Sequence, residues 1–239
     1  MRHLGWRLLV IAWLSFLATL TGVGFRGLVN PSITAFMQQR QLYLRAHGHP
    51  RARIEYQWVD YRDIAPAMRL AVVSSEDQTF PYNDGFDWLA IEEALRHNRV
   101  SRYIRGASTI TQQTAKNLYL WAGRSYFRKL LEAYFTVLMN LEWPKQRILE
   151  MYLNTAQFDN NVFGVGAAAR HLFNKSPARL SADEAALLAA ALPAPDRADM
   201  DDPSDYLLRR QGWILDQMQQ LGSAYLEGIE AGPPHNHKP

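Results

Sequence analysis

The chain has no cysteine among its 239 residues. This absence excludes disulfide bonds, thiolate metal sites and a cysteine nucleophile, although it assigns no compartment. The motifs Ser-x-x-Lys and Lys-Thr-Gly are also missing, which excludes an acyl-serine site of the penicillin-binding type. No internal repeat and no strong pair of strands is visible, so repeat architectures and sheet-based folds are not favoured.

Charge and apolar content permit several classes of protein. Apolar residues make up 48% and charged residues 21%, so a normal core can form and global disorder is not favoured. The net charge of +3 is compatible with nucleic acid, anionic lipid or a phosphate-bearing substrate, and does not choose among them. The length suits one domain of roughly 190–200 residues with an appendage.

The appendage is N-terminal and apolar. Between Arg7 and Arg26 lie 18 residues without a charge, and residues 4–6 extend the run to the roughly 20 residues that cross a bilayer. A cleaved signal peptide is the alternative, but its apolar region spans about 7–15 residues before a small-x-small site. The longer run without a clear Ala-x-Ala favours an uncleaved anchor over residues 1–30. Arginines follow as well as precede the run, so charge leaves its orientation open.

The rest of the chain has the 3.6-residue apolar period of helices. Helices are expected at residues 33–45, 65–75, 88–98, 107–120, 125–143, 145–154, 163–173, 185–192 and 203–221. Residues 54–59 alternate weakly and are expected to be extended. The sequence therefore predicts an all-α protein with one compact domain over residues 61–225. A linker or stalk at 31–60 joins it to the anchor, and residues 226–239 form a frayed tail.

Two acids follow the helix expected at 65–75. Glu76 and Asp77 precede a turn that contains Gly85, with Phe80 and Trp88 close by in sequence. Aromatic neighbours beside a carboxyl group suit a general acid or base, so this pair is a candidate for catalysis. The alternative is an ordinary acid exposed at the end of a helix.

A neutral polar stripe comes next. On a helix, Thr109, Gln112, Gln113 and Lys116 share one face, because they are spaced by three and four residues. Such a stripe can bind sugar hydroxyls and a phosphate, whereas a solvated face more often carries Glu and Lys.

Later polar residues are ambiguous alone. Arg128 and Glu132 have the spacing of an exposed ion pair, which contributes little. Lys145 and Asn154 are equally uninformative. The segment from Gly164 to Ala169 spells G-x-G-x-x-A, but a dinucleotide site needs a preceding strand in a βαβ unit, and none is expected here.

Taken in order, five blocks resemble the glycosyltransferase family 51 domain of peptidoglycan synthesis, and most closely the monofunctional biosynthetic peptidoglycan transglycosylases. The resemblance covers roughly residues 65–222. The family pattern E-D-x-x-F-x-x-H-x-G-x-D matches at Glu76, Asp77, Phe80, Gly85 and Asp87. G-A-S-T-[IL]-[TS]-Q-Q is complete at residues 106–113, and R-K-x-x-E matches at Arg128, Lys129 and Glu132. K-x-x-I-L-x-x-Y-L-N matches at residues 145–154, and residues 184–189 match the fifth region.

The resemblance implies a lysozyme-like helical fold and inverting polymerisation of lipid II, with release of undecaprenyl pyrophosphate. Glu76 would be the base, and Glu132 would assist at the pyrophosphate, directly or through Mg²⁺ or Mn²⁺. No organic cofactor is implied. We expect the two acids to face each other across one groove. The implied substrate-binding residues are Asp77, Phe80, Ser108, Thr109, Gln112, Gln113, Lys116, Arg128, Lys129, Lys145 and Asn154. Arg99, Arg102 and Arg105 are further candidates for holding pyrophosphate.

The resemblance also implies a setting. Lipid II and the growing lipid-linked glycan would be the partners, with the membrane itself and proteins of wall synthesis or division, and without nucleic acid. The chain would cross the cytoplasmic (inner) membrane once, with its catalytic domain on the periplasmic side. Asn83 stands where the family usually has His, so reduced or altered activity is expected. A lysozyme-like lytic enzyme and a non-catalytic wall-assembly scaffold are the alternatives.

Overall fold

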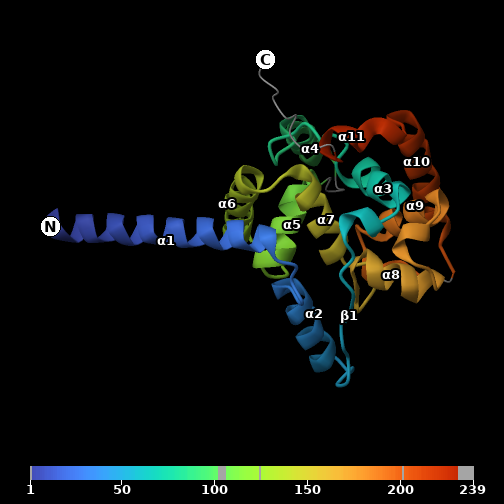
Figure 1. Cartoon of the computed structure of the whole chain (residues 1–239), viewed down its shortest axis with the longest axis horizontal. Helices are drawn as coiled ribbons and strands as arrows, with labels where there is room; N and C mark the ends of the chain where they lie inside the picture. The colour runs from blue at the N-terminus through green and yellow to red at the C-terminus, as the bar shows by residue number, and fades with distance from the viewer. Residues whose placement is uncertain (1, 102–105, 124, 201, 231–239) are drawn as a thin grey trace, which may run out of the picture.

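The computed structural model describes residues 2–101, 106–123, 125–200 and 202–230. Over these residues the chain is predominantly α-helical, with a single two-stranded sheet, so the predicted all-α class is confirmed. One long helix projects from a compact helical body (Figure 1). Short 3-10 helices join the larger elements at Tyr61–Asp63, Pro177–Arg179, Pro195–Arg197 and Ser223–Leu226.

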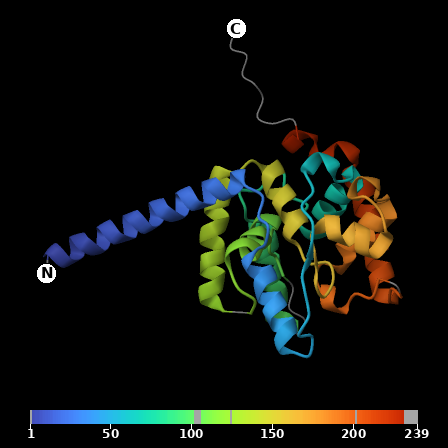
Figure 2. The same ribbon diagram turned by 60° about the horizontal axis from the view of Figure 1, so that its bottom comes forward.

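The projecting helix is α1 (Arg2–Leu28), and it is long and apolar enough to cross a membrane. Only its last turns touch the body (Figure 2). There Trp143 Nε1 donates to the Val23 carbonyl at 2.9 Å, and Arg147 Nε donates to the Gly27 carbonyl at 2.8 Å. Gly27 belongs to the last turn, whose carbonyls lack partners within the helix, and together the two side chains fix the end of α1 to the body.

The segment expected to be a linker is folded. It contains α2 (Ala35–Ala46), which packs on α5 (Ile110–Tyr119), and β1 (Glu55–Tyr56), which pairs in parallel with β2 (Val162–Phe163). Met37 of α2 is fully buried. The prediction of a separate stalk is therefore wrong, because its apolar side chains complete the core of the domain.

The core is built from α3 (Pro66–Glu76), α7 (Lys145–Thr155), α8 (Gly164–Phe173), α9 (Ala182–Ala191) and α10 (Asp205–Leu221). The alanines of α9 let α3 and α10 approach closely, and these contacts are among the most extensive in the fold. Burial of α3 up to its last turn places its final residue, Glu76, at the edge of the core.

Side-chain caps set the helix starts. Asp87 caps α4 (Trp88–Val100), and Ser125 caps α6 (Tyr126–Glu142). The expected start of α5 at residue 107 is wrong, because Thr109 and Gln112 form a capping box and the helix begins at Ile110.

Packing explains the G-x-G pattern at the start of α8. Gly164 has φ of +77°, and a Cβ there would lie 2.6 Å from the Asn154 carbonyl oxygen. A Cβ on Gly166 would lie 2.5 Å from the carbonyl oxygen of Gln57. Both positions therefore exclude a side chain, which accounts for the glycines without a nucleotide.

The domain continues beyond its predicted end at residue 225. Leu226 is buried, and Glu230, the last residue of α11 (Glu227–Glu230), accepts from Arg69 Nη1 at 2.6 Å and from the Tyr61 hydroxyl at 3.0 Å. Arg69 is itself buried and needs this carboxylate. The prediction of a frayed tail is thus wrong for residues 226–230, and residues 231–239 lie outside the described part.

Candidate functional site

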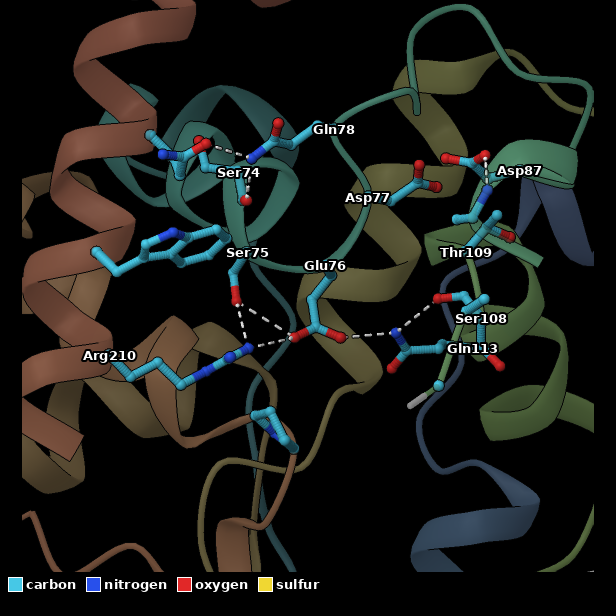
Figure 3. Close-up of a pocket in the computed structure, with 16 residues that line it drawn as sticks. Ser74, Ser75, Glu76, Asp77, Gln78, Asp87, Ser108, Thr109, Gln113 and Arg210 are labelled. Carbon is cyan, nitrogen blue, oxygen red and sulfur yellow. Dashed lines mark hydrogen bonds and ion pairs between the residues drawn. The ribbon is translucent and has the colours of Figure 1, made fainter. Parts of the chain in front are cut away.

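A cavity of about 670 Å³ opens at the end of α3 (Figure 3). Its walls come from α3, the start of α4, the segment before α5, α5 itself and α10. The lining residues are Ser74, Ser75, Glu76, Asp77, Gln78, Asp87, Ala90, Gly106, Ala107, Ser108, Thr109, Gln113, Pro193, Arg210, Trp213 and Gln217. The first two sequence blocks therefore meet in one cavity, as predicted.

Polar groups hold the Glu76 carboxylate on both sides (Figure 3). Gln113 Nε2 donates to Oε2 at 2.8 Å, while Ser75 Oγ donates to Oε1 at 3.3 Å. The Tyr152 hydroxyl donates to the Gln113 Oε1 at 3.2 Å, which turns the amide nitrogen toward Glu76. The Arg210 Nη2 lies 3.7 Å from Oε1. The carboxylate is thus fixed in place at the cavity wall.

The aromatic residues expected beside Glu76 do not line the cavity, although Trp213 of α10 does. Phe80 is fully buried in the core, and Phe86 stacks on Trp88 with ring centroids 5.3 Å apart, away from the cavity lining. The turn after Glu76 points these three rings elsewhere, and the polar contacts of Glu76 come from Gln113, Ser75 and Arg210. Phe80 is a core residue in this structure, and its role in substrate binding stays a prediction.

Asp77 ties the turn after α3 to the start of α5. Its carboxylate accepts from the Ile110 amide at 3.1 Å and from Asn83 Nδ2 at 2.9 and 3.1 Å. Burial raises the pKa of Asp77, and these hydrogen bonds act in the opposite direction. Asn83 also accepts from the Gly85 amide at 3.0 Å and from Lys145 Nζ at 3.1 Å. Asn83 thus shapes the turn beside Glu76 without carrying charge.

Lys145 lies behind this turn and does not line the cavity, contrary to its predicted role. Its ammonium is 4.9 Å from the Phe80 ring centroid. Burial lowers the pKa of Lys145 to about 8, although Asp77 and Asp84 act to raise it. The side chain therefore supports the turn, and its predicted contact with substrate stays a prediction.

The lowered pKa of Lys145 predicts a pH-dependent stability. The folded chain disfavours the charged ammonium, so the resulting destabilisation is present below about pH 8 and disappears as the pH rises toward the ordinary value of 10.5. We expect the stability of Lys145→Met relative to the unsubstituted chain to fall across this window. Urea unfolding of both chains in detergent measures it. A difference that stays constant with pH would contradict the prediction.

A cationic cluster adjoins the cavity. Arg128 Nη1 and Lys129 Nζ pair with the two oxygens of Glu132 at 2.8 and 2.5 Å. Lys129 Nζ also lies 3.1 Å from Ser108 Oγ, which lines the cavity. Lys116 faces this group, and burial lowers its pKa, while the carboxylates of Glu132 and Glu76 act to raise it. Three cations and one carboxylate leave a formal charge of +2 beside the cavity.

The two acids do not face each other across an open groove. The Glu132 side chain is only 4% exposed, and both of its oxygens are engaged by cations, so the expectation is wrong for this residue. The same pairing makes Glu132 a poor metal ligand, since two cations already occupy its oxygens. No group of three or more His, Cys, Asp or Glu side chains suited to a metal occurs among the described residues. Glu132 is placed to order Arg128 and Lys129.

Other predicted site residues serve the fold. Asn154 is fully buried and pairs with the Val59 backbone, accepting from its amide and donating to its carbonyl, both at 2.8 Å. Gln112 is buried in its capping box and does not line the cavity. Their predicted substrate contacts stay predictions. Thr109 lines the cavity with only 2% of its surface exposed. Arg99 is exposed at the end of α4, and Arg102 and Arg105 lie outside the described residues.

The α10 wall was not predicted. Arg210, Trp213 and Gln217 line the cavity from one face of this helix. Their spacing of three and four residues was the available signal, because it places an arginine, an aromatic and an amide on one side. The spacing does not indicate which other part of the chain this face of α10 packs against.

Comparisons with known proteins agree on one family. A family model described as "Transglycosylase" matches residues 45–219. A biosynthetic peptidoglycan transglycosylase of Xanthomonas axonopodis pv. citri is 50% identical over 200 residues, covering 83% of this chain and 81% of that protein. One from Aeromonas hydrophila is 45% identical over 215 residues, with 90% of each chain covered. One from Cronobacter sakazakii is 50% identical over 221 residues, covering 90% and 91%.

Proposed function

The chain belongs to the transglycosylase family, and from this premise we propose that it polymerises lipid II into β-1,4-linked glycan strands. Each transfer joins the 4-hydroxyl of an acceptor GlcNAc to the anomeric carbon of the donor. The bond from that carbon to undecaprenyl pyrophosphate breaks, and inversion at the carbon converts an α link to a β link. One observation carries this proposal: a fixed carboxylate, Glu76, lines a cavity beside a cluster with surplus positive charge.

Inversion in one displacement requires a base at the attacking hydroxyl and help for the leaving group on the opposite side. Glu76 is placed for the first task, because its carboxylate reaches the cavity and its hydrogen bonds hold its orientation. It takes the proton from the acceptor hydroxyl as the new bond forms. Gln113 keeps the carboxylate in position through this step.

The cationic cluster is placed for the second task. Lys116, Arg128 and Lys129 offer N–H donors to the oxygens of the departing pyrophosphate, on which negative charge grows in the transition state. Glu132 orients Arg128 and Lys129 and lowers their mutual repulsion. Ser108 joins this cluster to the Glu76 cavity, because its hydroxyl contacts Lys129 Nζ.

A membrane-bound substrate explains the rest of the molecule. The helix α1 anchors the chain, and α6 stands on the side of the body from which α1 emerges (Figure 2). The helix α6 exposes large apolar side chains, which suit contact with lipid. They are Tyr126, Phe127, Leu130, Val137 and Leu141. We place the anchor in the cytoplasmic membrane with the domain on its periplasmic side, where the lipid-linked substrate is polymerised.

The deciding experiment incubates the purified full-length chain with labelled lipid II, and separately with purified sacculi. Long glycan strands from lipid II, without release of fragments from sacculi, are the expected result. Fragment release would favour a lytic enzyme, and binding of lipid II without turnover would favour a scaffold.

A parallel arm with EDTA measures whether Mg²⁺ or Mn²⁺ is needed. Digestion of the domain by protease added to spheroplasts tests the periplasmic orientation.

A further inference from the structure

The cavity has a cation that the sequence blocks do not include. Arg210 Nη2, from α10, lies 3.7 Å from Glu76 Oε1 and donates to Ser75 Oγ at 3.2 Å (Figure 3). Ser75 in turn donates to the same Glu76 oxygen at 3.3 Å. The guanidinium, the hydroxyl and the carboxylate thus form one connected group at the cavity wall.

From this geometry we infer that Arg210 is a positioning residue for Glu76. Its guanidinium, together with the Ser75 hydroxyl, keeps the carboxylate turned toward the cavity until an acceptor hydroxyl arrives. The inference rests on the proposed function, in which Glu76 is the base. It assigns to α10 a part in the reaction that the matched motifs leave out.

The separation between the two charges matters. At 3.7 Å the pair attracts, but the distance is too long for a hydrogen bond. The arginine therefore orients the carboxylate while leaving an oxygen lone pair of Glu76 available for the incoming proton. A direct bidentate pair would occupy both oxygens. Gln113 restrains the other oxygen, so the carboxylate is held from two sides.

The setting of Arg210 is not that of a surface arginine. Its side chain is 24% exposed, and its Nε is buried without a hydrogen-bond partner in the described part of the chain. An unpaired buried donor is unfavourable, so packing alone does not explain this residue. Its exposed neighbour Arg209 lies on the same helix but does not line the cavity, and it provides a matched control.

The other charged and titratable groups around Glu76 must be considered with Arg210. Lys116 on α5 is a second cation, and Asp77 and Asp87 are acids that line the same cavity. Tyr152 on α7 is fully buried, which raises its pKa well above the usual value and keeps it neutral. Loss of Arg210 therefore removes the cation that holds Glu76 from the side of α10, while Lys116 and the two acids stay in place.

The test compares Arg210→Gln, Arg210→Lys and Arg209→Gln by measuring kcat and KM separately for labelled lipid II. For Arg210→Gln we expect kcat to fall roughly tenfold, because a misoriented base slows the chemical step, whereas KM changes less than about twofold. Arg210→Lys should recover most of the lost kcat, and Arg209→Gln should match the unsubstituted chain.

Two results would overturn the inference: an unchanged kcat for Arg210→Gln, or a loss of activity that is due entirely to a higher KM. If circular dichroism shows that Arg210→Gln is not folded, Arg210→Met decides, because methionine replaces the apolar stem of the side chain without its charge. The same loss of kcat is then expected, and an unchanged kcat contradicts the inference. An unsubstituted chain that fails to polymerise lipid II would instead contradict the proposed function.

Discussion

Substitution of Glu76 by Gln is expected to lower the rate of glycan polymerisation by a factor of about 10²–10⁴, the usual contribution of a general base. The amide cannot accept the proton of the acceptor hydroxyl. It retains an oxygen for the hydrogen bond from Gln113, so the cavity wall keeps its shape. Chain growth from labelled lipid II measures the rate, and circular dichroism with thermal unfolding measures the fold.

A matched control separates the loss of the base from the loss of a charge. Glu92 on α4 is an exposed residue paired with Arg96, so Glu92→Gln removes the same charge outside the cavity lining. Its polymerisation rate should equal that of the unsubstituted chain. Lipid II should still bind to Glu76→Gln, because the phosphate-binding cations are unchanged. Normal chain growth by Glu76→Gln would show that another group accepts the proton.

Local sequence signals predicted the helices well. Asp87, Ser125 and Ser181 each accept from a backbone amide at the start of the helix that they precede. These caps depend only on a few neighbouring residues, so they are visible in one sequence. The segment at 31–60 was misjudged because Met37 and β1 gain their partners only from distant parts of the chain.

Motif matches located the cavity but did not distinguish residues that line it from residues that support the fold. Phe80 and Asn154 occupy matched positions, yet both are fully buried and hold the backbone in shape. A motif shows only which residue types occur together. A residue required for a turn or for a buried hydrogen bond therefore looks the same in the motif as a residue that contacts substrate. Burial in three dimensions distinguishes the two.

Charge pairing was also hidden from the sequence. The spacing of Arg128, Lys129 and Glu132 indicated an ordinary surface pair, whereas Glu132 is almost completely buried under both cations. Arg210 lies 135 positions after Ser75, so no local pattern could connect it with Glu76. Contacts between residues so far apart in the sequence can be identified only from the folded structure.

Lys116 carries the second large prediction, since it has no ion-pair partner within the described part of the chain and faces the cluster beside the cavity. Its ammonium lies 5.3 Å from the Phe36 ring centroid, in a setting where burial lowers its pKa. An ammonium held in this way is unfavourable for the folded chain but well placed for a pyrophosphate. Lys116→Met is therefore expected to have opposite effects on activity and stability.

Loss of one charge-assisted hydrogen bond to phosphate should lower kcat/KM for lipid II by roughly 10- to 150-fold. The free energy of unfolding at neutral pH should rise, because the methionine removes a charge from a half-buried position. Lys116→Arg, which keeps the charge, should retain more activity without this gain in stability. Lys175→Met, a substitution at an ion pair with Glu184 outside the cavity, is the control and should leave kcat/KM unchanged. A Lys116→Met chain that is both less stable and less active would show that the ammonium supports the fold, and the phosphate contact would then have to come from Arg128 and Lys129 alone.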